Sequence, residues 1–243
     1  MKKLLKPLLL LVFGFVVCNN LASAAGISVN VDGRDTGPLD ILFLSTLLTL
    51  LPTIVLLMTC FTRIVIVFSF LKNAMGTAQV PPTQVVVGLS LCLTLFVMSG
   101  PVKQIENEAY RPYKAGQING EQALLKAAEP LKRFMCNNTR KEDLALFMKI
   151  SKTPPVKDFR DLEMITVVPA FVVSEIRTAF VIGFSLFIPF IVVDMVVSSI
   201  LMSLGMVMLP PAMISLPFKI LLFILADGWG MLIKSLVEGF KMG

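Results

Sequence analysis

Residues 178–233 read TAFVIGFSLFIPFIVVDMVVSSILMSLGMVMLPPAMISLPFKILLFILADGWGMLI, and this stretch decides the fold class. Only Asp194, Lys219 and Asp227 interrupt it with charge. About 20 apolar residues suffice to cross a bilayer as a helix, so the stretch is long enough for two crossings. Leu209-Pro210-Pro211 separates its two arms, because the two prolines forbid a continuous helix. We therefore expect an all-α membrane protein with an apolar helical hairpin over residues 169–243.

The rest of the composition agrees with this expectation. The chain has 243 residues, of which 56% are hydrophobic and only 16% are charged, against about a quarter charged in soluble domains. Residues 41–62 carry no charge. We expect a helix from near Asp40 to about Leu71, then a second apolar stretch over residues 85–98. Together they predict a first apolar hairpin over residues 41–100.

The first 25 residues have the order of a cleavable signal peptide. A basic start is followed by an apolar run of about 10 residues and a small-residue exit, which predicts cleavage after Ala24 or Ala25. The alternative is a retained transmembrane helix, for which this run is too short. Residues 26–40 then form a polar linker on the outer, periplasmic side of the membrane.

Residues 101–168 are polar and contain twelve Lys and Arg and nine Asp and Glu. Apolar residues recur there at helical spacing, which predicts a small helical domain with breaks at Pro112, Pro130 and Pro154-Pro155. The topology that follows from the signal peptide puts this domain in the periplasm. Mixed charge of this kind is typical of solvated helix faces and does not indicate nucleic-acid binding.

The residues needed for most enzyme chemistry are missing. The chain has no histidine and no paired-cysteine motif among its four cysteines. Histidine is the commonest general base and a frequent zinc ligand, and no phosphate-binding glycine motif replaces it. We expect no catalytic, cofactor-binding or metal site.

Six charged residues interrupt the apolar segments. A charge at mid-bilayer depth costs about 2.5–3.5 kcal/mol on insertion scales, so such residues face a partner or a wet cavity. They either form ion pairs that hold helices together or line and gate a path. The six are Arg63, Glu175, Arg177, Asp194, Lys219 and Asp227.

The expected hairpin brings two of these carboxylates to one level. Asp194 lies about 15 residues before the Leu209-Pro210 turn and Asp227 about 17 after it, so both sit roughly 22–27 Å from the tip. Two carboxylates at one level repel each other unless a cation intervenes. Our hypothesis is that a basic group of a neighbouring subunit, such as Arg63, neutralises them.

The expected hairpin tip is rich in methionine. Residues 202–213 contain four methionines. Methionine is unbranched and soft, so these side chains either fill a core gap or close a pore around irregular contents. Non-helical backbone at membrane depth is tolerated only when it is buried in protein or lines a cavity, which favours the second interpretation.

Several blocks of this sequence resemble a known family of flagellar export-gate proteins, FliP, which has injectisome counterparts. The likeness covers essentially the whole chain after the signal peptide. The blocks are Thr62–Val67, Asn73–Thr77, Pro81-Pro82, Phe187–Asp194, Leu201–Met206, Pro210-Pro211, Ile214–Lys219 and Asp227-Gly228-Trp229.

This resemblance implies a non-enzymatic, pore-forming core subunit of the flagellar type III protein export gate. Several copies, five by the resemblance, would assemble with FliR- and FliQ-type subunits into a helical ring. The ring would sit with other export-apparatus membrane proteins at the flagellar basal body in the inner membrane. Unfolded flagellar subunits would pass through it, and Met206, Val207 and Met208 would form a gasket around the pore. The alternative from the residues alone is a small-solute transporter or channel subunit.

Overall fold

The computed structural model describes residues 38–77, 81–152, 162–206 and 208–241. The expected signal peptide, Ala24 and Ala25, most of the linker, and Val207 lie outside the described residues. The chain divides into two compact units, Met1–Leu51 and Pro52–Gly243. All helices after the first described one lie in the second unit.

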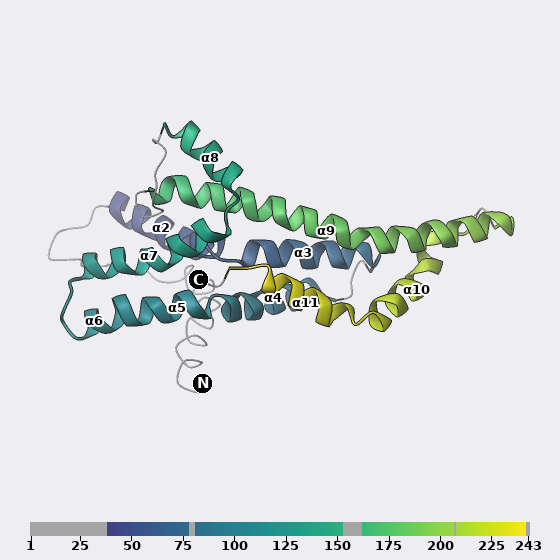
Figure 1. Ribbon diagram of the computed structural model, residues 1–243, viewed down its shortest axis with the longest axis horizontal. Helices are drawn as coiled ribbons and strands as arrows, with labels where there is room; N and C mark the ends of the chain where they lie inside the picture. The colour runs from purple at the N-terminus through teal and green to yellow at the C-terminus, as the bar shows by residue number, and fades with distance from the viewer. Residues whose placement is uncertain (1–37, 78–80, 153–161, 207, 242–243) are drawn as a thin grey trace. The chain divides into compact units, whose positions relative to one another are not determined.

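The described residues form helices and contain no strand (Figure 1). In chain order these are α2 (Pro38–Leu57), α3 (Phe61–Ala74), α4 (Thr83–Val97), α5 (Ser99–Ile105), the π-helix η1 (Glu106–Tyr110), α6 (Arg111–Lys114), α7 (Gly120–Asn138), α8 (Lys141–Ile150), α9 (Met164–Ser203), α10 (Pro211–Leu225) and α11 (Gly228–Glu238).

The helix expected from Asp40 to Leu71 is interrupted, and this expectation was wrong. Helix α2 ends at Leu57 and α3 begins at Phe61. The Thr59 hydroxyl donates to the Leu56 carbonyl at 2.7 Å and accepts from the Phe61 amide at 3.3 Å. One side chain therefore satisfies backbone groups on both sides of the break. Pro52, by contrast, lies inside α2.

The polar segment is helical where it is described, but Pro112 and Pro130 act differently from our expectation, whereas Pro154-Pro155 lies outside the described residues. Pro130 is buried inside the continuous helix α7, so it does not break the helix there. Pro112 lies in α6, directly after the π-helix, whose wider turn interrupts the regular bonding before it. Asn119 starts α7 with a capping box, because its side chain accepts from the Gln122 amide at 2.8 Å.

Helix α9 is much longer than a bilayer is thick. Its 40 residues extend about 60 Å, against about 30 Å of hydrocarbon. Pro169 and Pro189 lie within it. Among the described residues, α9 alone is long and apolar enough to cross a membrane. Up to four spans result if the bent pairs Leu48–Leu57 with Phe61–Ala74, Thr83–Val97 with Ser99–Lys114, and Pro211–Leu225 with Gly228–Glu238 each count as one.

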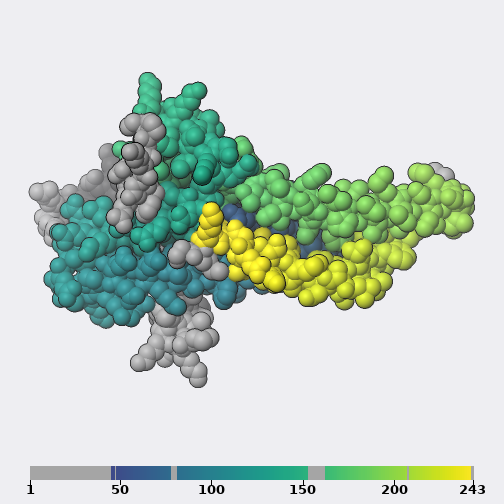
Figure 2. Space-filling view, in the orientation of Figure 1, coloured from purple at the N-terminus to yellow at the C-terminus, as the bar shows by residue number. Residues whose placement is uncertain are grey.

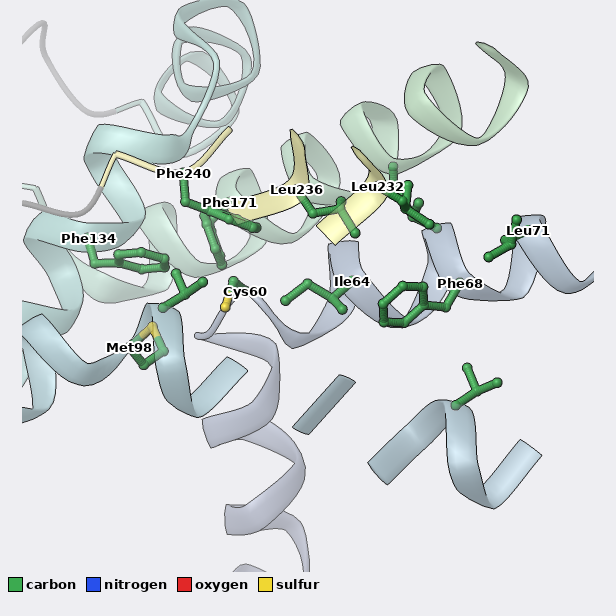
Figure 3. Close-up of a cluster of buried hydrophobic side chains, with 14 of the residues drawn as sticks. Cys60, Ile64, Phe68, Leu71, Met98, Phe134, Phe171, Leu232, Leu236 and Phe240 are labelled. Carbon is green, nitrogen blue, oxygen red and sulfur yellow. The ribbon is translucent and has the colours of Figure 1, made fainter. Parts of the chain in front are cut away.

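The core of the second unit forms around α3, which runs alongside α9 (Figure 1). Buried positions on α3 recur every three or four residues, and all of them except Arg63 are apolar, so one face of the helix packs along its whole length. Side chains of α7, α9, α11 and the segment after α11 pack around this face (Figure 3). They are Phe134, Phe171, Leu232, Leu236 and Phe240. Each such buried side chain contributes roughly 1.5–3 kcal/mol. This core fixes α9 at its α3 side, and past the end of α3 the described helix that lies beside α9 is α10 (Figure 1).

Candidate functional site

A buried ion pair joins α3 to α9. Arg63 donates from Nε to Glu175 at 2.8 Å, and its Nη2 also binds this carboxylate. Its Nη1 donates to the Gly239 carbonyl at 3.2 Å, and the guanidinium lies 3.9 Å from the centroid of the Phe240 ring. The side chains are 5% and 0% exposed. Every nitrogen of Arg63 therefore has a partner, and one side chain ties α3, α9 and the C-terminal segment together.

A second ion pair lies on the α9–α10 hairpin. Lys219 of α10 contacts the Asp194 carboxylate of α9 at 2.6 Å, and its Nζ donates to the Ala74 carbonyl at 3.2 Å. The Ser215 hydroxyl donates to the other Asp194 oxygen at 2.5 Å. Lys219 thus places a positive charge at the C-terminal end of α3, where the helix dipole favours it.

This arrangement corrects our hypothesis about the two carboxylates. Lys219 of the same chain neutralises Asp194, whereas Arg63 is already paired with Glu175. The residue opposite Asp194 on the other arm is Lys219 and not Asp227. The physical reason is the break after α10: Asp227 lies beyond the end of that helix, where the chain bends by 62°. The expectation that Asp194 and Asp227 lie at one level assumed two straight helices, and the bend after α10 removes that condition.

Arg177 connects α9 to α8. Its Nη2 lies 3.2 Å from Asp143 Oδ1, and Asp143 is buried while Arg177 is half-exposed. The second Asp143 oxygen has no hydrogen-bond partner in the described part of the chain. Sequence reasoning missed both Asp143, which was one acid among many in the polar segment, and Ser215. The spacing of Ser215 and Lys219 by one helical turn could have indicated Ser215.

Asp227 occupies an unusual position between α10 and α11. Its φ of 47° is left-handed, and its exposed side chain makes no hydrogen bond to the helix that it precedes. A Cβ at Gly230 would overlap the Asp227 carboxylate, so glycine there leaves room for it. The negative charge thus lies at the N-terminus of α11, which the helix dipole favours.

The hairpin tip has a defined backbone. The Gly205 amide donates to Met202 O at 3.1 Å and the Met206 amide to Leu201 O at 2.9 Å. With Gly205 at φ 73°, these bonds form a Schellman motif that ends α9. Pro211 then starts α10. Met206 is 48% exposed and Met208 97%. Both methionines therefore point away from the core, while Val207 lies outside the described residues.

An apolar groove of about 800 Å³ runs between the two arms of the hairpin. Its walls are aliphatic and aromatic side chains of α9 and α10, such as Val196, Ile200, Phe218 and Leu221. In the space-filling view, side chains of both arms lie at the surface (Figure 2). The three ion pairs described above hold helices together. Within the described residues, no group of three or more His, Cys, Asp or Glu could hold a metal ion.

Comparison with known proteins identifies close relatives. A sequence model described as the FliP family matches residues 44–236. The chain is 52% identical over 200 residues to the flagellar biosynthetic protein FliP of Bacillus subtilis, which covers 82% of this chain and 90% of that protein. It is 51% identical over 199 residues to that of Pectobacterium carotovorum, covering 82% and 77%. For Aquifex aeolicus the values are 45% over 212 residues, 86% and 89%.

Proposed function

The chain belongs to the FliP family, and from this premise we propose that it is a pore-forming core subunit of the flagellar protein export gate. It acts in several copies with FliR- and FliQ-type subunits in the inner membrane, at the flagellar basal body. Unfolded flagellar subunits pass outward through the assembly. The segment from α5 to α8 faces the periplasm, after a signal peptide has delivered the N-terminus to that side.

The observation that carries this proposal is the exposed methionine tip of the α9–α10 hairpin. Met206 and Met208 end a structure whose arms expose apolar side chains. Exposed apolar surface of this extent requires cover by lipid or by other subunits. The backbone between the arms is not helical, and at membrane depth such backbone must be buried in protein or line a cavity. A ring of tips meets this requirement, with flexible methionine side chains closing the opening.

The ion pairs have a structural role in this proposal. Arg63 with Glu175 and Lys219 with Asp194 are satisfied within one chain, so they hold each subunit in shape and leave the tip to close the path. Arg177 does the same between α9 and the α8 segment. A gate of this kind needs no catalytic group of its own.

Replacing Met206 and Met208 by alanine in a motile strain tests the proposal. We expect the membrane to leak ions, measured with a potential-sensitive dye, while flagellar subunits still appear in the medium. Met213→Ala is the matched control, because Met213 is also exposed but lies in the first turn of α10. Unchanged permeability of the double variant would refute the gasket. Purification as a small unit without other gate subunits would favour a solute transporter instead.

A further inference from the structure

The charges on the apolar helices balance in pairs, except for two. Among the described residues of α3, α4, α9, α10, α11 and the junction at Asp227, four cations have an acid partner: Arg63, Arg177, Lys219 and Lys234. The remaining cation is Lys72 and the remaining acid is Asp227, and in this part of the structure neither has an ion-pair partner. Within these described helices, a single copy therefore carries one unmatched charge of each sign.

Lys72 lies at the edge of a second apolar groove. This groove, of about 300 Å³, lies between α3, α4 and α11 and is lined by residues that include Leu71, Val85 and Trp229. The Lys72 ammonium makes one long hydrogen bond, 3.4 Å, to the Thr83 hydroxyl. The side chain therefore lines a groove in which no described residue is acidic.

Asp227 is presented on an apolar corner. Ile224 and Leu225 beside it are exposed by 67% and 77%. The left-handed backbone at Asp227 is unfavourable for a residue other than glycine, although aspartate tolerates it better than most. Backbone strain of this kind clusters at functional positions. When this corner is covered by lipid or protein, the carboxylate needs a counter-ion.

We propose that Lys72 of one copy pairs with Asp227 of the next copy, so that the α10–α11 corner of one chain docks on the α3–α4–α11 groove of its neighbour. A large apolar side chain beside Asp227, such as Leu225, enters the groove while the two charges neutralise each other. A second copy is the occupant because this chain itself supplies both unmatched charges. The contact uses two different surfaces, so it is head-to-tail and repeats from copy to copy. This inference rests on the proposed multi-copy assembly and names one contact within it.

Charge reversal tests the pairing. Two copies with different tags are coexpressed, and one is recovered from detergent-solubilised membranes while the other is quantified. We expect Lys72→Glu and Asp227→Lys, each placed in both copies, to lower recovery roughly tenfold or more. The double variant with both reversals should restore it, because each reversed pair again has opposite signs. Lys234→Glu is the control, since Lys234 is an exposed cation on α11 with an acid partner of its own.

Disulfide formation then shows whether the pair lies between copies or within one. Lys72→Cys and Asp227→Cys are combined in one chain whose other cysteines are replaced. Head-to-tail contact predicts a ladder of cross-linked multimers after oxidation. A product that stops at the dimer, a faster-migrating cross-linked monomer, or no cross-link in chains that still copurify would each overturn the proposal.

Different results would refute the Lys72–Asp227 contact and the multi-copy assembly. Unmodified copies that copurify while the reversals change nothing would refute this contact and leave the assembly standing. Unmodified copies that do not copurify at all would refute the contact and the proposed function together.

Discussion

Replacement of Glu175 by glutamine should destabilise the protein strongly. The substitution keeps the shape of the side chain but leaves the Arg63 charge without its acid, at a site where the two side chains are 5% and 0% exposed. Breaking a buried ion pair by neutralising one partner typically costs about 3–5 kcal/mol. Two of the Arg63 contacts, to Gly239 and Phe240, remain. They favour a value near the lower end, about 3 kcal/mol.

A double-mutant cycle separates the pair from its surroundings. Its single variants are Arg63→Met, which leaves Glu175 charged and unpaired, and Glu175→Leu, which leaves Arg63 charged and unpaired. We expect each to lose about 3–5 kcal/mol. Combining Arg63→Met with Glu175→Leu removes both charges and fills the space with apolar groups, so it should cost far less than the sum of the single changes.

The assay is unfolding of the detergent-solubilised protein by heat or denaturant, followed by circular dichroism at 222 nm, a helix signal. Glu142→Gln provides the control, because Glu142 belongs to an exposed pair with Arg140 at 3.6 Å, worth about 0–1 kcal/mol. Single variants at Arg63 and Glu175 that behave like this control would refute the assignment. So would a double variant as unstable as the sum of the single ones.

Two further substitutions and one labelling reaction have expected outcomes. Gly183→Ala places a Cβ against the ring of Phe70, and this overpacking between α3 and α9 should destabilise the protein by about 1–3 kcal/mol, measured by the same unfolding assay. Gly205→Val forces a β-branched residue into φ 73°, which should alter the backbone of the tip. A cysteine introduced at position 206 should then react with maleimide at a different rate. Gly88→Ala is the control, because a Cβ there meets open space and should leave that rate unchanged. Burial raises the pKa of the Cys136 thiol, and only the thiolate reacts. Cys136 should therefore react with iodoacetamide more slowly than a small free thiol at pH 8, and the difference should shrink as the pH rises through the raised pKa.

Local features of the fold could be predicted from sequence where one segment decides them. The Pro210-Pro211 break and the two apolar arms lie in one stretch, and residues 206 and 208 lie at the tip as expected. The break at Thr59 was missed because Thr59 is one of five threonines in an uncharged, largely apolar run over residues 41–62, and none of them stands out. Helix α7 passes through Pro130, whose ring is buried, so tertiary burial outweighs local propensity there.

The partners of the charged residues could not be predicted, because they come from distant parts of the chain. Arg63 and Glu175 are 112 positions apart, and the Lys219 bond to Ala74 joins residues 145 positions apart. Periodicity shows which face of a helix is apolar, but it does not show which helix lies opposite. The hypothesis for Arg63 failed for this reason, although the six charges themselves were recognised. The Schellman motif at Gly205 likewise depends on backbone angles, which the amino-acid sequence does not specify by itself.

Helix α9 continues unbroken beyond its packing against α3. Phe70 of α3 contacts Phe187 of α9, and from Phe187 to Ser203 α9 extends about 24 Å. A tilt of about 5° around the Phe187 contact would move the end of the helix by about 2 Å. A small repacking beside α3 is therefore transmitted to the hairpin tip. If α9 were instead interrupted at Pro189, the bend there would take up the tilt, and the methionines at the tip would not move.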